Sequence, residues 1–202
     1  MNVSLAALSA PGMLVIELQN DLCAPALCDE RGLSGALARA VRDREVLAHV
    51  RAVLERMRAR GIPVLYPTKE RHPGEPLPDH APIYRGAAAT EMLVHGTWGA
   101  QIVDEVAPQP GDLVLPRFTG IDPSVGAGLW EVLEHLGIET LIVAGISTTL
   151  AVEGTVRAAA NRGFRVVVLE DCCASVPDDW HRFSVEHILP LLATVTSSET
   201  LT

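Results

Sequence analysis

The chain has 202 residues, of which 48% are hydrophobic, and its formal net charge is −9 at pH 7. This length and composition suffice for one domain with a full core, so we expect a single domain over residues 1–202. The acidic balance argues against a nucleic-acid partner, because phosphate binding needs a basic surface. No apolar run is long enough to span a bilayer and the first residues do not resemble a signal peptide, so we expect a cytoplasmic protein without a membrane partner.

Strand and helix patterns alternate along the chain. Continuous apolar runs predict strands at 12–18, 62–67, 112–116, 139–145, 164–169 and 191–196. The patterns between them predict helices near 34–60, 97–106, 124–136, 150–162 and 178–189. The expected fold is therefore α/β: a three-layer α/β/α Rossmann-like fold whose six-stranded, mostly parallel sheet has helices on both faces.

The segment 68–96 is the longest one without clear periodicity, and it contains four prolines. Long segments of this kind inside a compact domain are usually functional. We expect a functional loop or a contact surface between subunits.

The cysteines are Cys23, Cys28, Cys172 and Cys173, and no pair has the Cys-x-x-Cys spacing of a zinc site. We expect them to be reduced, with the adjacent pair acting as small core residues.

Polar residues follow three of the predicted strands, where ligands bind to parallel sheets. These stretches are Glu-Leu-Gln-Asn-Asp at 17–21, Thr-Lys-Glu-Arg-His at 68–72 and Gly-Ile-Ser-Thr-Thr at 145–149. The last stretch leads through Ala151 into a predicted helix, whose first N–H groups can bind an anion. A strand–turn–helix junction of this kind is suited to holding a nucleophile, but the side chain of Ala151 has no reactive atom.

Three segments resemble the isochorismatase-like, or cysteine hydrolase, superfamily, which includes nicotinamidases, N-carbamoylsarcosine amidases and isochorismatases. They are MLVIELQNDLC at 13–23, GDLVLP at 111–116 and AGISTTLAVEGTVRAAANRGFRVVVLEDCCAS at 144–175. The resemblance covers nearly the whole chain and implies the α/β fold described above. It also implies a cis peptide bond between Ile146 and Ser147, and assembly into a homo-oligomer.

The chain departs from the resembled amidases at each of their three catalytic positions. Those enzymes use an aspartate, a lysine and a cysteine, where this sequence has Glu17, Arg117 followed by Phe118, and Ala151. A covalent acyl-enzyme needs a nucleophilic side chain, so the loss of the cysteine argues against conventional amide hydrolysis. Ser147, Thr148 and Thr149 are nearby hydroxyls, but without a histidine partner they are weak nucleophiles.

An acid, a cation and an anion pocket remain, and they suit the isochorismatase branch of the resemblance. Hydrolysis of a vinyl ether needs a proton on carbon and then water, but no covalent nucleophile. Glu17 ends a buried strand, so desolvation should raise the pKa of its carboxyl toward the range of a general acid. We expect hydrolysis of a small anionic metabolite with Glu17 as acid. The alternatives are a non-catalytic ligand-binding or partner subunit and, less favoured, an amidase with a displaced nucleophile.

The expected site residues follow from these positions. An anionic substrate needs cations, for which Arg117, Lys69, Arg71 and Arg85 are the candidates. The expected catalytic residues are Glu17 and Arg117, and the expected substrate-binding residues are Gln19, Ser147, Thr148, Ala151, Lys69 and Trp98. No cofactor is expected.

Glu70 and His72 have the spacing of an Asp-x-His pair that binds metal in the resembled nicotinamidases, and His80 is a possible third ligand. Such a pair on a proline-rich loop is a weak signal, so a solvated loop without a metal is the favoured interpretation. His181 and His187 are expected to lie on faces of the last helix.

Overall fold

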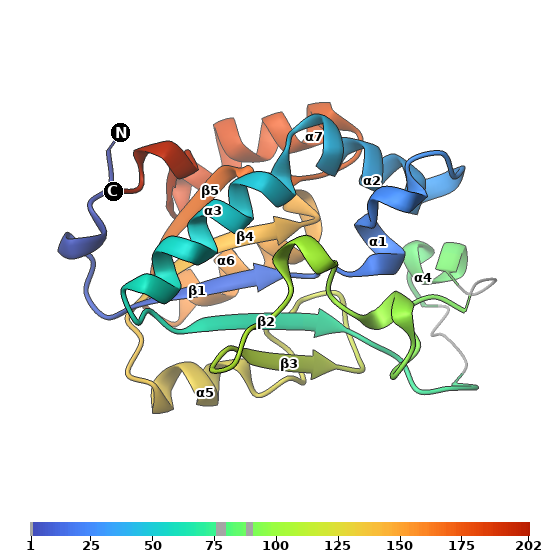
Figure 1. Ribbon diagram of the computed structural model, residues 1–202, viewed down its shortest axis with the longest axis horizontal. Coiled ribbons are helices and arrows are strands. Elements are labelled where there is room, and N and C mark those ends of the chain that lie inside the picture. The colour runs from blue at the N-terminus through green and yellow to red at the C-terminus, as the bar shows by residue number, and fades with distance from the viewer. Residues whose placement is uncertain (1, 76–79, 88–90) are drawn as a thin grey trace.

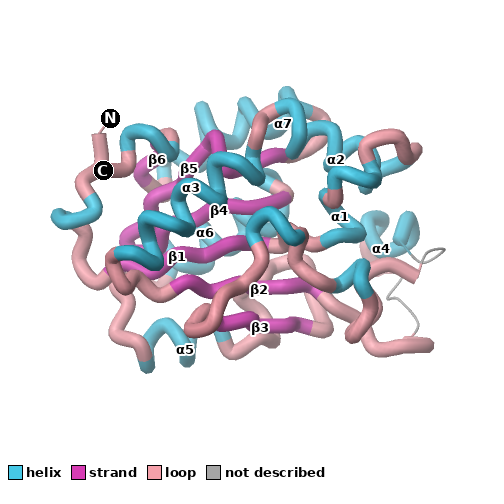
Figure 2. Tube along the Cα trace, in the orientation of Figure 1, coloured by secondary structure: helices cyan, strands magenta, loops and turns pink. Residues whose placement is uncertain are grey.

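The computed structural model describes residues 2–75, 80–87 and 91–202. Six strands form one sheet in the order β3-β2-β1-β4-β5-β6, and every pairing is parallel (Figures 1 and 2). The strands are β1 (Pro11–Ile16), β2 (Val64–Lys69), β3 (Leu113–Arg117), β4 (Thr140–Ile146), β5 (Arg165–Ala174) and β6 (Thr194–Thr196). The predicted α/β fold with six strands is confirmed, and the sheet is wholly parallel.

The connections between the strands are mainly helical. The α-helices are α1 (Asn20–Cys23), α2 (Gly32–Asp43), α3 (Val46–Ala59), α4 (Pro82–Ala87), α5 (Leu129–His135), α6 (Glu153–Asn161) and α7 (Asp178–Phe183). Shorter 3-10 and π turns are η1 (Leu5–Ala7), η2 (Pro25–Leu27), η3 (Trp98–Ala100), η4 (Asp104–Val106), η5 (Thr148–Val152), η6 (Ser184–Ile188), η7 (Leu189–Leu191) and η8 (Ser198–Thr200). None of the helices in the described ranges has the length and apolar character needed to cross a membrane.

Two apolar clusters cover the two faces of the sheet. Met13 and Val15 of β1 pack with residues of α2 and α3, whereas Leu14 and Ile16 pack with residues of α5 and α6. Successive side chains of a strand point to opposite faces, so a strand between two helical layers must be apolar at every position. The continuous apolar runs in the sequence reflect this double burial.

Several predicted helices are shorter in the structure than expected. The helix predicted at 34–60 is divided between α2 and α3, because Glu45 adopts a left-handed conformation with φ 53°. The region predicted as one helix at 97–106 forms two separate turns, η3 and η4. Ile102, between these turns, forms a β-bridge with Gln19, which keeps the chain extended there. The helix predicted at 124–136 begins only at Leu129, after two glycines with positive φ.

The last two predicted elements also differ. The helix expected at 178–189 is divided into α7 and the π turn η6. The strand expected at 191–196 is reduced to β6, because η7 occupies 189–191. Pro190 lies in the first turn of η7, where its missing N–H is tolerated but where it could not donate to a sheet.

Candidate active site

The candidate site lies where β1 to β4 end, at one edge of the sheet (Figure 1). Ile16 pairs with Gly145 across β1 and β4, and Lys69 pairs with Arg117 across β2 and β3. Because the strands are parallel, the residues that follow them emerge at this same edge. The predicted residues Glu17, Lys69, Arg117 and Ser147 are brought to one edge by this register.

Glu17 turns the chain out of β1. Its backbone is left-handed, with φ 53°, and its N–H donates to the carbonyl of Pro67 at 3.2 Å. A non-glycine residue in this conformation is strained, and such strain is commonly kept at functional sites. The carboxylate contacts the guanidinium of Arg117, and the Glu17 side chain is only 12% exposed.

Arg117 ends β3 and is almost completely buried, with 1% of its side chain exposed. Its Nη2 contacts Glu17 Oε1 and donates to the carbonyl of Ile121 at 3.0 Å. Its Nε and Nη1 are buried and have no hydrogen-bond acceptor in the described part of the chain. A buried donor without an acceptor costs folding free energy. The guanidinium of Arg117 can therefore donate further hydrogen bonds to oxygen atoms of a ligand.

The electrostatics of the pair are set by burial. Desolvation raises the pKa of the Glu17 carboxyl above its ordinary value, although the charges of Arg117 and Lys69 pull it down. Asp122 adds to the increase, because it is a like charge. Burial and the positive charge of Arg117 lower the pKa of Lys69. Asp122 was not among the predicted site residues, because it lies in the loop after β3, where no sequence pattern distinguishes it.

Gln19 is buried and braces the site. Its Nε2 donates to the carbonyls of Lys69 at 2.9 Å and Ala100 at 2.7 Å, and its Oε1 accepts the Lys69 N–H at 2.8 Å. These bonds tie the end of β1 to the end of β2, whereas substrate binding by Gln19 stays a prediction. Trp98 is 54% exposed, and its carbonyl accepts a hydrogen bond from Asn20 at 2.8 Å.

The turn after β4 has the geometry that the resemblance implied. The peptide bond between Ile146 and Ser147 is cis, as expected. Gly145 has φ +126°, and a Cβ there would collide with the backbone of Ile16, so this position requires glycine. Ala151 lies in η5, is 2% exposed, and its methyl group belongs to the apolar cluster beneath α5 and α6.

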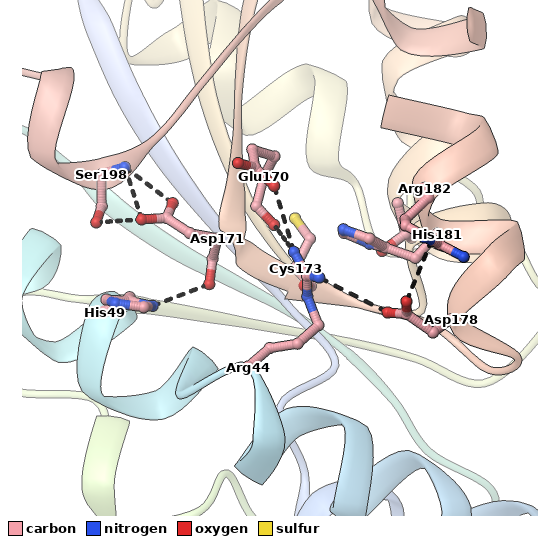
Figure 3. A network of polar contacts seen from close by, with 10 residues as sticks. Arg44, His49, Glu170, Asp171, Cys173, Asp178, His181, Arg182 and Ser198 are labelled. Carbon is pink, nitrogen blue, oxygen red and sulfur yellow. Dashed lines mark hydrogen bonds and ion pairs between the residues drawn. The ribbon is translucent and has the colours of Figure 1, made fainter. Parts of the chain in front are cut away.

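The structure corrects the expectation that the hydroxyls at this turn have no histidine partner. Thr148 Oγ1 lies 2.8 Å from His181 Nδ1, and both residues are buried. Burial lowers the pKa of His181 to about 4, with a further contribution from Arg44 (Figure 3). His181 therefore lies on a buried face of α7. Thr148 is directed into the protein, which does not favour it as a nucleophile.

Glu70, His72 and His80 are not gathered into a metal site. Among the residues that the structure describes, no group of three histidine, cysteine or acidic side chains fits a metal ion. The ring of His72 stacks on Phe118 at 4.1 Å, and His80 lies 5.2 Å from the ring of Tyr84. Glu70 instead pairs with His95, a contact that no local pattern predicts because 25 positions separate the two residues. The side chain of Arg85 lies outside the described part of the structure.

The comparisons with known proteins agree with the fold. The Isochorismatase domain model matches residues 11–200. Ureidoacrylate amidohydrolase RutB from Methylobacterium radiotolerans is 29% identical over 87% of this chain and 72% of its own length. The RutB of Agrobacterium fabrum is 34% identical over 52% of this chain, and the match covers 47% of the length of that relative.

Solved structures superpose over almost the whole chain. N-carbamoylsarcosine amidase from Thermoplasma acidophilum has a TM-score of 0.72 at 25% identity and covers 95% of this chain and 98% of its own. An isochorismatase family protein from Desulfovibrio vulgaris has a TM-score of 0.79 at 22% identity, with 94% and 95% covered, and shows the shared fold. With the domain model matched over residues 11–200, the chain belongs to the isochorismatase family of hydrolases.

Proposed function

We propose that this protein hydrolyses a small anionic metabolite without a covalent intermediate, using Glu17 as a general acid on a vinyl ether. The observation that carries the proposal is the buried Glu17–Arg117 pair beside a turn whose nucleophile position is Ala151. A carboxylic acid can protonate carbon alone, whereas acyl transfer requires a side-chain nucleophile.

Arg117 supplies the reason to expect an anion. One of its three nitrogens is engaged by Glu17 and Ile121, while Nε and Nη1 have no acceptor among the described residues. A carboxylate of the substrate at Nη1 would satisfy a buried donor that has no acceptor among the described residues. Lys69 adds a second positive charge close to the pair.

Substrate binding would also prepare the acid. An anion at Arg117 offsets the positive charge that now pulls down the pKa of Glu17, while the desolvation that raises this pKa persists. The carboxyl would therefore hold its proton more strongly in the complex than in the free protein. This coupling favours protonation of the acid when substrate is bound.

The names of the relatives suggest a different bond, since both the amidohydrolase and the amidase act on amide-type substrates by name. The buried methyl group of Ala151 supplies no atom for an acyl-enzyme, and Thr148 is held by His181. We therefore retain the small anionic substrate and replace amide cleavage by acid-catalysed hydrolysis of an ether.

The test is release of pyruvate from isochorismate, whose enolpyruvyl ether is a vinyl ether carrying a carboxylate. Glu17→Gln should lower kcat by about 10²- to 10⁴-fold, the usual contribution of a general acid. Glu55→Gln, which changes an exposed glutamate of α3, is the matched control and should leave kcat unchanged. Equal turnover by the wild type and Glu17→Gln would refute the proposal.

A non-catalytic binding protein is the second candidate, favoured by the engagement of the Glu17 carboxylate by Arg117. Calorimetric titration with isochorismate separates the two. Binding without pyruvate release, retained in Glu17→Gln and lost in Arg117→Met, would identify a binding protein. Under this alternative, Ala151→Cys adds no turnover.

A further inference from the structure

A second carboxylate, Glu70, forms a pair with an imidazole at the same edge of the sheet. Glu70 Oε2 lies 2.5 Å from His95 Nδ1. The two partners differ in exposure, because 10% of the Glu70 side chain and 57% of the His95 side chain are exposed. The carboxylate is thus buried while the ring projects outward, the arrangement in which an acid orients a histidine for chemistry at its other nitrogen.

Both partners are fixed by the sheet. Thr68 Oγ1 donates to Glu70 Oε1 at 3.2 Å, and the Glu70 N–H donates to the carbonyl of Arg117 at 2.9 Å. The N–H of His95 donates to the carbonyl of Arg71 at 2.9 Å, next to the β-bridge between Arg71 and Val94. The pair is therefore mounted on the ends of β2 and β3.

The same elements place the pair beside the Glu17–Arg117 site. Phe118 directly follows Arg117, and its ring centroid lies 5.6 Å from that of His95. From His95 the chain runs back along the edge to the end of β1, where the N–H of Asn20 donates to Gln101 at 2.8 Å. The imidazole thus lies on a segment that spans the ends of the strands carrying Glu17 and Arg117.

The hydrogen bond fixes the tautomer. An ionised carboxylate only accepts hydrogen bonds, so a pair made of an ionised Glu70 and a neutral His95 has the ring proton on Nδ1 and the lone pair on Nε2. A lone pair at the exposed nitrogen of an oriented ring is the arrangement of a general base. Ala151 offers no nucleophile in this chain, and hydrolysis without a covalent intermediate needs water to be deprotonated.

We infer that His95 is the general base that activates water in this enzyme, with Glu70 as its positioning residue. The inference rests on the proposed vinyl-ether hydrolysis. Glu17 gives its proton to the terminal carbon, and the π electrons form the new C–H bond. Water then forms a C–O bond to the resulting oxocarbenium carbon while His95 Nε2 takes one of its protons. The imidazolium returns that proton to the leaving ether oxygen as its C–O bond breaks, and the hemiketal hydroxyl proton restores Glu17.

The first test needs no substrate. Long-range ¹H–¹⁵N NMR of the histidine rings in the wild-type protein should show His95 as the Nδ1–H tautomer with a proton in a strong hydrogen bond. Glu70→Ala should abolish that resonance and convert His95 to the Nε2–H form. An Nε2–H tautomer in the wild type would overturn the inference whatever the protein's activity.

The second test measures pyruvate release from isochorismate. His95→Gln should lower kcat by about 10²- to 10⁴-fold with KM unchanged, because a base acts on water and not on substrate binding. His187→Gln is the matched control, since His187 is 60% exposed and lies 3.9 Å from Glu186 without a short hydrogen bond. Loss of turnover in Glu17→Gln with full turnover in His95→Gln would overturn this inference and leave the proposed function intact. Full turnover in Glu17→Gln would instead refute the proposed function.

Discussion

At the scale of single residues, the buried ion pair between Glu17 and Arg117 should couple the effects that substitutions of the two residues have on stability. Breaking a buried ion pair leaves an uncompensated charge, whereas replacing both partners removes that penalty. The Arg117 side chain is 1% exposed and that of Glu17 is 12% exposed, so solvent gives little relief to a lone partner. The two positions should therefore behave as a unit in stability measurements.

We expect Arg117→Met alone to lower the free energy of unfolding by roughly 3–5 kcal/mol, and Glu17→Gln alone by less, because glutamine still offers an oxygen to the guanidinium. The double variant should lose less than the sum of the two, by on the order of 1 kcal/mol or more. Urea denaturation of the four proteins measures this cycle. Strict additivity would show that the pair is not coupled.

His181 makes a separate prediction about acid. Its pKa is about 4 in the folded protein, against 6.5 for an ordinary histidine, because burial disfavours the charged ring. The unfolded chain then binds a proton that the folded chain excludes. The contribution of a neutral, buried His181 to the free energy of unfolding is therefore complete above about pH 6.5 and is lost as the pH falls toward about 4.

Between pH 7.5 and 4.5 this linkage should remove roughly 2–3 kcal/mol from the free energy of unfolding. His181→Gln should be less stable than the wild type at pH 7.5, having lost the contact with Thr148, but should lose less on acidification. Denaturation at the two pH values tests this, with His187→Gln as the exposed control. The same pH dependence in His181→Gln as in the wild type would contradict the assignment.

At the scale of elements, the division between α2 and α3 shows what the sequence could not reveal. No glycine or proline interrupts residues 36–60, so the local pattern predicts one continuous helix. Arg44 lies at the break, where its Nε donates to the carbonyl of Cys173 at 3.1 Å and its Nη2 donates to that of Glu170 at 3.2 Å (Figure 3). The chain bends where a contact with β5 outweighs helix continuation, and local periodicity does not report such a contact.

Arg44→Ala should therefore cost about 2–3 kcal/mol of unfolding free energy, because hydrogen bonds from a charged donor to buried carbonyls are among the stronger ones. Its ion pairs with Glu170 at 3.3 Å and Asp178 at 3.7 Å add little. Arg42→Ala is the matched control, because Arg42 contacts Asp43 in solvent and should not affect stability measurably. Equal stabilities of the two variants by urea denaturation would contradict this role for Arg44.

At the scale of the whole molecule, continuous apolar runs were sufficient to predict the parallel sheet, because burial of both faces of each strand requires apolar residues at successive positions. They also placed Glu17, Lys69 and Ser147 at one edge, since strand ends define that edge. The pairs Thr148–His181 and Glu70–His95 were not predictable. Each joins residues 25 or more positions apart through loops whose course no periodic pattern specifies.

We also expect the chain to assemble into a homo-oligomer. A net charge of −9 opposes self-association, so a stable contact must bury apolar surface. In the segment 68–96, the candidate surface from the sequence, Ile83 is 38% exposed. Trp180 and Phe183, at neighbouring positions on α7, are 60% and 57% exposed. The aromatic pair of α7 offers more apolar area than Ile83.

We therefore expect light scattering after size-exclusion chromatography to give a multiple of the monomer mass, and Trp180→Glu to reduce it to the monomer. A charge placed at the centre of an aromatic contact must be desolvated without a partner, which is unfavourable enough to dissociate most subunit contacts. Ile83→Glu tests the alternative surface and should leave the mass unchanged. If Ile83→Glu dissociates the assembly while Trp180→Glu does not, the contact lies at 68–96. A wild type that elutes as a monomer at all concentrations would remove the expectation of an oligomer.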